Sequence, residues 1–190
     1  MYTEIEAKLK VDSLVEIKRK LNELDAEFLQ EQMQTDYHFD DAKMTLQKTD
    51  RCLRLRRQLV GKNERFFLTY KSAKEKSSFK KRQEIEIEVA DSSDIQKLLL
   101  ALGYKKVLVF EKKRQLWNLE DCKVALDKLP LLGDFIEIEG PDEKKIENVQ
   151  KSLGLSELPH IKKSYAGLIT DRLCELGKDQ KEVYLTNSDL

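Results

Sequence analysis

Alternation of charged and apolar residues with a period of two runs through most of the chain, and it predicts β-strands with two different faces. In segment 2–11, Glu4, Glu6 and Lys8 share one face, whereas apolar residues occupy the other. Most of the other segments carry a similar ionic face. The predicted strands span residues 2–11, 51–57, 66–72, 82–89, 107–117, 124–128 and 135–139, with 37–40 as an additional short strand.

Four segments instead repeat their apolar residues with the helical period of 3.6, which predicts amphipathic helices. Ser13 and Glu16 have the spacing of a capping box at the start of the first helix. The predicted helices span 13–27, 91–102, 142–153 and 164–176. We expect a single domain over residues 1–176, followed by a polar C-terminal tail at 177–190.

The two periods together predict how the elements pack. A helix with one apolar stripe must bury it, and the apolar strand faces are the available partner. The ionic faces then point either to solvent or into an enclosed interior. They recur on nearly every strand, and Arg54 and Arg56 place two guanidinium groups side by side. We therefore predict an α+β fold in which a closed antiparallel β-barrel has a polar interior and amphipathic helices packed outside.

The composition excludes several classes of function. The 190 residues include 35 Lys and Arg against 35 Asp and Glu, so the formal net charge is zero. Zero net charge argues against a non-specific nucleic-acid binder. Neither a membrane-spanning apolar run nor a signal peptide is apparent. Three widely spaced cysteines argue against a disulfide framework or a cysteine zinc site. We expect a cytoplasmic protein that binds neither nucleic acid nor a membrane.

The charges are sorted into blocks along the chain. Residues 51–82 contain twelve basic and two acidic residues, whereas 115–148 contain nine acidic and four basic ones. Buried cations need an anionic partner, and the guanidinium group matches phosphate oxygens. Carboxylates can face the same phosphates if Mg²⁺ or Mn²⁺ lies between them. The pattern predicts a phosphate-chain site with a basic wall and an acidic, metal-binding wall.

Several short motifs follow one another in a fixed order along the chain. They are E-x-E-x-K at Glu4–Lys8, R-x-R at Arg54 and Arg56, K-x-R at Lys112 and Arg114, and segments around Lys71, Arg82, Asp127, Glu137 to Glu139 and Tyr165. In this order they make the sequence similar to the CYTH superfamily of triphosphate tunnel metalloenzymes, and most similar to its class IV adenylyl cyclase group. The resemblance covers roughly residues 1–176 and implies an eight-stranded antiparallel barrel that forms a triphosphate tunnel.

On this resemblance we assign roles to individual residues. Glu4, Glu6 and Glu139, assisted by Glu137, are expected to hold one or two Mg²⁺ or Mn²⁺ ions. The triphosphate oxygens are assigned to Lys8, Arg54, Arg56, Lys71, Arg82, Lys112 and Arg114. The catalytic set is Glu4, Glu6, Lys8 and Asp127, with Asp127 orienting a basic residue or a metal-bound water. Glu84 and Glu86 are expected to form ion pairs that hold the arginines.

The first hypothesis for the function is conversion of ATP into cyclic AMP and pyrophosphate. The alternatives are an inorganic or thiamine triphosphatase that releases orthophosphate, and a non-catalytic polyphosphate- or nucleotide-binding module. A complete acidic metal set counts against the last. The expected partner is a small molecule with a triphosphate, namely ATP, tripolyphosphate or thiamine triphosphate, and a homodimer is left open.

Other polar and aromatic residues are interpreted as structural. His38 and His160 lack partners at metal-ligand spacing, and Trp117 and Tyr165 are expected to pack, although Tyr165 could lie at the tunnel mouth. The basic segment 74–81 is either a mobile loop that recruits an anion or an ordinary solvated hairpin.

Overall fold

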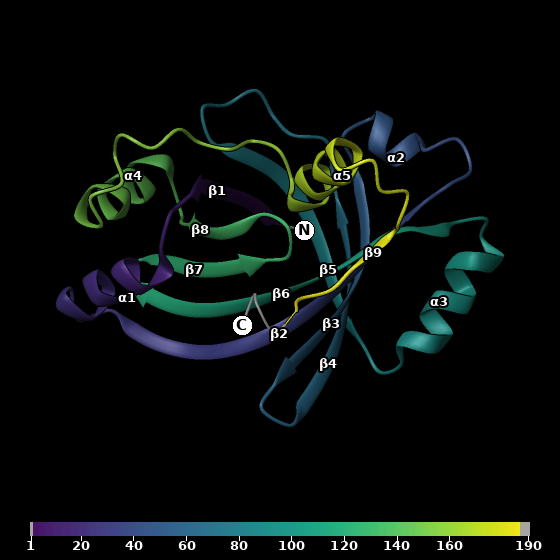
Figure 1. Cartoon of the computed structure of the whole chain (residues 1–190), viewed down its shortest axis with the longest axis horizontal. Helices are drawn as coiled ribbons and strands as arrows, with labels where there is room; N and C mark the ends of the chain where they lie inside the picture. Colours follow the sequence, from purple (N-terminus) through teal and green to yellow (C-terminus); the bar gives the residue numbers. More distant parts are fainter. Residues whose placement is uncertain (1, 187–190) are drawn as a thin grey trace.

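Eight antiparallel strands close into a barrel in the computed structural model, which describes residues 2–186 (Figure 1). The order around the barrel is β2-β3-β4-β5-β1-β8-β7-β6, and pairing of β6 with β2 closes the ring. The predicted closed barrel is therefore confirmed. The strands are β1 (Tyr2–Lys10), β2 (Glu27–Asp40), β3 (Cys52–Val60), β4 (Asn63–Lys71), β5 (Lys80–Val89), β6 (Lys105–Leu119), β7 (Cys122–Leu129) and β8 (Gly133–Glu139).

The helices are α1 (Leu14–Glu23), α2 (Thr45–Lys48), α3 (Ser92–Ala101), α4 (Glu143–Ser152) and α5 (Tyr165–Glu175). All except the short α2 were predicted, and each of these four begins after a residue whose side chain caps a backbone N–H group: Ser13, Asp91, Asp142 and Ser164. Figure 1 shows α1 and α4 on one side of the barrel and α3 on the opposite side. Within residues 2–186, none of the helices has the length and apolarity that crossing a membrane requires.

The largest apolar core lies between the helices and the outer face of the barrel. Ile17 and Leu21 of α1 and Ile146 and Val149 of α4 are buried in one cluster with the outward residues of β1, β7 and β8. Burial of each such side chain contributes about 1.5–3 kcal/mol. Because the outer face supplies the core, the inner face of the same strands is free to carry charge.

Strand β2 is longer than predicted, and α1 is shorter. The helix ends at Glu23 and the chain turns at Asp25, whose φ of 54° lies in the left-handed region. The strand then runs through fourteen residues, whereas only 37–40 were predicted. Gln32 and Gln34 occupy its buried face, but most of the residues next to them are also polar. The alternation of polar and apolar residues that would predict a strand is therefore missing.

Part of the segment predicted as a polar tail packs against the barrel. The short strand β9 (Glu182–Val183) pairs in parallel with β6 at Val109 and Phe110. Val183 is 4% exposed and lies in a core cluster with Phe110 and with Ile169 of α5. This contact connects the C-terminal segment to the end of the barrel that α5 covers.

Replacing Val183 with alanine tests this contact. The Val183→Ala variant is expected to lose about 1–3 kcal/mol of unfolding free energy in urea, because two buried methyl groups are removed. The matched control is Tyr184→Ala, because Tyr184 is 47% exposed, and it should change the free energy by about 0.5 kcal/mol or less. Equal effects of the two substitutions would contradict a packed β9.

Candidate active site

The inward strand faces surround a cavity of about 940 Å³ lined by charged side chains of both signs. All the residues predicted to bind phosphate or metal line this cavity, whereas Asp127 lies behind it and is fully buried. The lining cations include Lys8, Arg54, Arg56, Lys71, Lys80, Arg82, Lys112 and Arg114, and the lining carboxylates include Glu4, Glu6, Asp36, Glu84, Glu86, Glu137 and Glu139.

The carboxylates of β1 are each paired with a lysine. Lys71 Nζ lies 2.8 and 3.0 Å from the two carboxylate oxygens of Glu4, and Lys80 bonds to Glu6. Lys8, two residues further along β1, lies 3.3 Å from Glu137 of β8. The expected separation into a basic and an acidic wall is therefore wrong, because cations and carboxylates interleave around the barrel.

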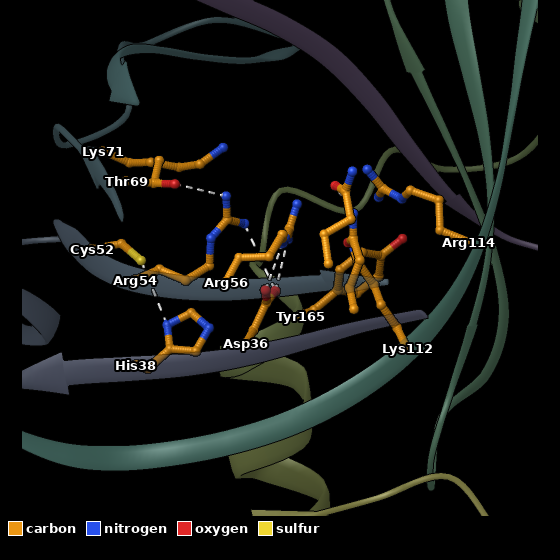
Figure 2. A network of polar contacts seen from close by, with 12 residues as sticks. Asp36, His38, Cys52, Arg54, Arg56, Thr69, Lys71, Lys112, Arg114 and Tyr165 are labelled. Carbon is orange, nitrogen blue, oxygen red and sulfur yellow. Dashed lines mark hydrogen bonds and ion pairs between the residues drawn. The ribbon is translucent and has the colours of Figure 1, made fainter. Parts of the chain in front are cut away.

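Asp36 of β2 fixes the two arginines of β3 (Figure 2). Arg56 donates to both its oxygens, at 2.6 and 2.8 Å, and Arg54 approaches it to 3.8 Å. Arg54 also donates to Thr69 at 3.1 Å and lies 3.5 Å from Glu86. Burial tends to raise the pKa of Asp36, but Arg56 and Arg54 hold that pKa well below its usual range. Asp36 is therefore an ionised carboxylate inside the barrel.

Asp127 of β7 plays the same part for Arg114 of β6. Arg114 Nε donates to Asp127 at 2.6 Å, and its Nη2 bonds to both Asp127 and Glu137. Tyr165 of α5 donates its hydroxyl to Asp127 at 2.9 Å, and its ring lies 4.1 Å from Lys8 Nζ. This geometry matches the expectation that Asp127 contacts a basic residue. It also places Tyr165, predicted as a packing residue, against the charged interior.

Two of the buried lysines have pKa values close to neutral pH. Burial and the neighbouring Arg114 lower the pKa of Lys112 to about 7, although Asp127 lies 3.6 Å away. Burial and Lys80 likewise lower the pKa of Lys8 to about 8, against the opposing effect of Glu137. An added anion would favour the protonated form of both side chains.

The acidic residues of β1 and β8 have the chemistry of a divalent-cation site. Glu6 and Glu139 are direct cross-strand partners, so their side chains lie on the same face. The side chain of Glu139 has no ion pair or hydrogen bond within residues 2–186, and burial, Glu4 and Glu6 raise its pKa. In that part of the chain no three metal-ligating side chains converge. Carboxylate oxygens are ligands that Mg²⁺ and Mn²⁺ prefer, but in this structure Glu4 and Glu6 are paired with Lys71 and Lys80.

Other residues in the cavity were missing from the sequence-based assignment. Asp36, Gln32 and Gln34 come from the unpredicted part of β2, and Lys80 comes from segment 74–81. Lys80 is only 7% exposed and begins β5, so it belongs to neither alternative proposed for that segment. Its position two residues before Arg82 was the available signal, because side chains two apart share a strand face.

The other residues interpreted as structural have protein partners. His38 stacks on Phe110, with ring centroids 5.5 Å apart, and His160 contacts Gln150 at 2.9 Å. Trp117 is 3% exposed in the main core. Glu86 forms the expected ion pair with an arginine, Arg54, at 3.5 Å, whereas Glu84 pairs with Lys71 at 2.6 Å and not with an arginine.

Known proteins of solved structure share this fold. A protein of Pyrococcus horikoshii OT3 has a solved structure with a TM-score of 0.78 and 31% identity, covering 89% of this chain and 99% of its own. A Hippeastrum protein described as having a dominant triphosphatase activity is 20% identical, with a TM-score of 0.66 over 93% and 97% of the two chains. The latter likeness concerns the fold alone.

The fold and the site define a barrel whose interior is a charged tunnel. The CYTH domain family matches residues 2–165, and the chain belongs to this family. A Methanocaldococcus jannaschii relative, named "Putative adenylate cyclase MJ0240", is 30% identical over 174 residues, which cover 87% of this chain and 97% of the relative.

Loss of the Asp36 charge should destabilise the barrel. Asp36→Asn preserves the size of the side chain but leaves Arg54 and Arg56 without their shared carboxylate. We expect the free energy of unfolding to fall by about 3–5 kcal/mol at pH 7, measured with urea. Because the pKa of Asp36 is lowered on folding, this contribution is present above its unfolded pKa of about 4 and is lost as the pH falls through the folded value.

Glu31→Gln is the matched control for Asp36→Asn. Glu31 lies on the same strand and pairs with Lys113 at 3.1 Å, but its side chain is 44% exposed. Its loss should cost at most about 1 kcal/mol. A wild-type free energy of unfolding in Asp36→Asn would contradict the structural role of the buried carboxylate.

Proposed function

We propose that this protein is a metal-dependent enzyme that holds the triphosphate of ATP in the barrel and forms cyclic AMP with release of pyrophosphate. The observation that carries the proposal is the set of buried cations converging on one cavity. The cavity also has neutral lining residues, among them Phe39, Met44 and Leu46, which offer contacts for a nucleoside. The name of the M. jannaschii relative supports a cyclase reaction.

The chain's own residues would act mainly by positioning and by neutralising charge. Arg54 and Arg56 would donate to phosphate oxygens, with Asp36 keeping their guanidinium groups oriented. Lys8 and Lys112 would stabilise the charge that develops as pyrophosphate leaves. In this reaction the ribose 3′-hydroxyl must lie in line with the α-phosphorus.

Glu4, Glu6 and Glu139, with Glu137, would hold Mg²⁺ or Mn²⁺. When bound, the cation would neutralise phosphate oxygens. Lys71 and Lys80 now pair with Glu4 and Glu6, so a triphosphate that attracts these lysines would release the carboxylates for metal binding. Triphosphate and metal would therefore each favour binding of the other.

A triphosphatase is the second candidate function, and the activity described for the Hippeastrum protein favours it. In that reaction water attacks the terminal phosphorus and orthophosphate leaves. Both reactions could use the same cations, with the nucleophile placed at the α-phosphorus in one reaction and at the terminal phosphorus in the other. The two reactions differ in their products, so product analysis separates them.

The deciding experiment incubates the protein separately with ATP, tripolyphosphate and thiamine triphosphate, each with Mg²⁺ or Mn²⁺, and identifies the products by ³¹P NMR and chromatography. Cyclic AMP and pyrophosphate from ATP are the expected result. Release of orthophosphate would replace the cyclase by a triphosphatase. Tight triphosphate binding without turnover would indicate a binding module and would refute both enzymatic proposals.

Removing one carboxylate of β1 tests the metal assignment. Glu6→Gln is expected to reduce metal-dependent turnover at least about 100-fold, because it removes a proposed ligand and also unpairs Lys80. Glu23→Gln, on the exposed surface of α1, is the control and should retain turnover. Unchanged metal-dependent turnover in folded Glu6→Gln protein would reject the assignment.

Triphosphate binding should depend on the protonation of Lys112. The pKa of Lys112 is about 7 in the free protein, so above pH 7 the side chain must take up a proton to bind an anion. We expect the affinity for tripolyphosphate to fall by up to about tenfold per pH unit from this cause. Isothermal titration calorimetry between pH 6.5 and 9 measures the effect.

Lys112→Arg is the matched control, because arginine keeps its charge over this range. The ligand itself also titrates, but it does so identically with both proteins. The ratio of the wild-type to the Lys112→Arg dissociation constant should therefore rise with pH. A ratio that stays constant from pH 6.5 to 9 would exclude Lys112 as the titrating group.

A further inference from the structure

One thiol faces the tunnel and has no part in the proposed reaction. Cys52 is the first residue of β3, and it shares the inward face of that strand with Arg54 and Arg56. Its cross-strand partner is Lys71 of β4. The thiol is thus a lining group of the cavity, two residues from a cation assigned to phosphate.

The thiol is paired with an imidazole. Cys52 Sγ lies 3.5 Å from His38 Nδ1, and the two side chains come from adjacent strands (Figure 2). The His38 ring is held by its stacking on Phe110, and its Nε2 is buried without a hydrogen-bond partner among residues 2–186. His38 is therefore oriented with Nδ1 toward the thiol, and it can accept or share the thiol proton.

The surroundings of this pair favour an anion. Arg82 of β5 is 4% exposed, lines the same cavity, and makes no side-chain hydrogen bond within residues 2–186; its ion contact with Glu4 is as long as 3.8 Å. Burial raises the pKa of the Cys52 thiol, but His38, Arg54 and Arg82 outweigh that effect and lower it to about 7. A substantial fraction of Cys52 is therefore thiolate at neutral pH.

The other two cysteines lack this environment. Cys122 is 2% exposed, and burial together with Glu120 and Asp121 raises its pKa to about 11. Cys174, on α5, is exposed to solvent. Cys122 and Cys174 can therefore serve as internal controls, the first for a buried thiol and the second for an accessible one.

We propose that Cys52, activated by His38, is a covalent modification site that forms a mixed disulfide with anionic low-molecular-weight disulfides and thereby closes the tunnel to triphosphates. The Cys52 thiolate attacks one sulfur of the disulfide, a new S–S bond forms, and the original S–S bond breaks. Cys52 is oxidised, and the departing half is reduced to a thiol that takes up the proton lost by Cys52. An added thiol reverses the reaction.

Closure of the tunnel follows from the position of Cys52, and this part of the proposal rests on the proposed function. The attached group would occupy the cavity beside Arg54 and Arg82, where the phosphate chain is proposed to bind. Bound triphosphate would in turn shield Cys52. Modification and triphosphate binding should therefore exclude each other.

The reaction is tested on the whole protein with oxidised glutathione, which is anionic, and cystamine, which is a cationic disulfide. Peptide mass spectrometry at pH 7 should show Cys52 modified before Cys174, with Cys122 unmodified. Oxidised glutathione should react with Cys52 about tenfold or more faster than cystamine does, relative to their rates at Cys174. His38→Gln should slow modification of Cys52 and leave that of Cys174 unchanged. Modification of Cys174 in preference to Cys52 would overturn the proposal.

Closure is measured separately, as tripolyphosphate binding by calorimetry. The Cys52 mixed disulfide should bind at least about tenfold more weakly than the reduced protein, and dithiothreitol should restore binding. Cys52→Ser should bind normally and be insensitive to oxidised glutathione. Unchanged binding after modification of Cys52 would refute closure. Failure of the unmodified protein to bind tripolyphosphate would instead refute the proposed function. Modification of Cys52 would still be tested in that case, because mass spectrometry measures it independently of binding.

Discussion

Charged side chains that are withdrawn from water must be compensated, because an unpaired buried charge costs several kcal/mol. The interior of this barrel contains cations and carboxylates on most of its strands, and the contacts of Glu4, Glu6 and Asp36 show how they are balanced. The balance requires each strand to contribute its charges on the inner face and its apolar residues on the outer one. The strand register, the position of the helices and the chemistry of the cavity all follow from this requirement.

The arginines and the lysines meet this requirement in different ways. Arg56 and Arg114 are each held by two hydrogen bonds to one aspartate, a geometry that fixes both the position and the plane of the guanidinium group. Lys8 and Lys80 make contacts through a single nitrogen on a flexible stem. Arg56 and Arg114 therefore form a rigid frame, and the lysines are the cations that can change partners when another anion enters.

Much of this arrangement could be predicted from the sequence, because it depends on local alternation. The inward positions of Glu4, Glu6 and Lys8 follow from a period of two, and the helix starts follow from caps such as Ser13. The individual ion pairs do not follow, since Lys71 and Glu4 are 67 residues apart and meet only through the order of the strands. Strand β2 was largely missed because both faces around its glutamines are mostly polar, so no alternation is visible. The two residues of β9 are too few to show a periodic pattern.

The pairing of interior cations with the chain's own carboxylates has a consequence for folding. A barrel lined only by cations would need its ligand in order to fold, whereas a barrel whose cations are paired with its own carboxylates can close without one. The cost is that an incoming polyanion must compete with those carboxylates for the lysines. Glu139 has no such pair within residues 2–186, and it lies opposite Glu6. In the proposed function, this carboxylate without an ion pair favours a ligand that brings a divalent cation together with its phosphates, rather than phosphates alone.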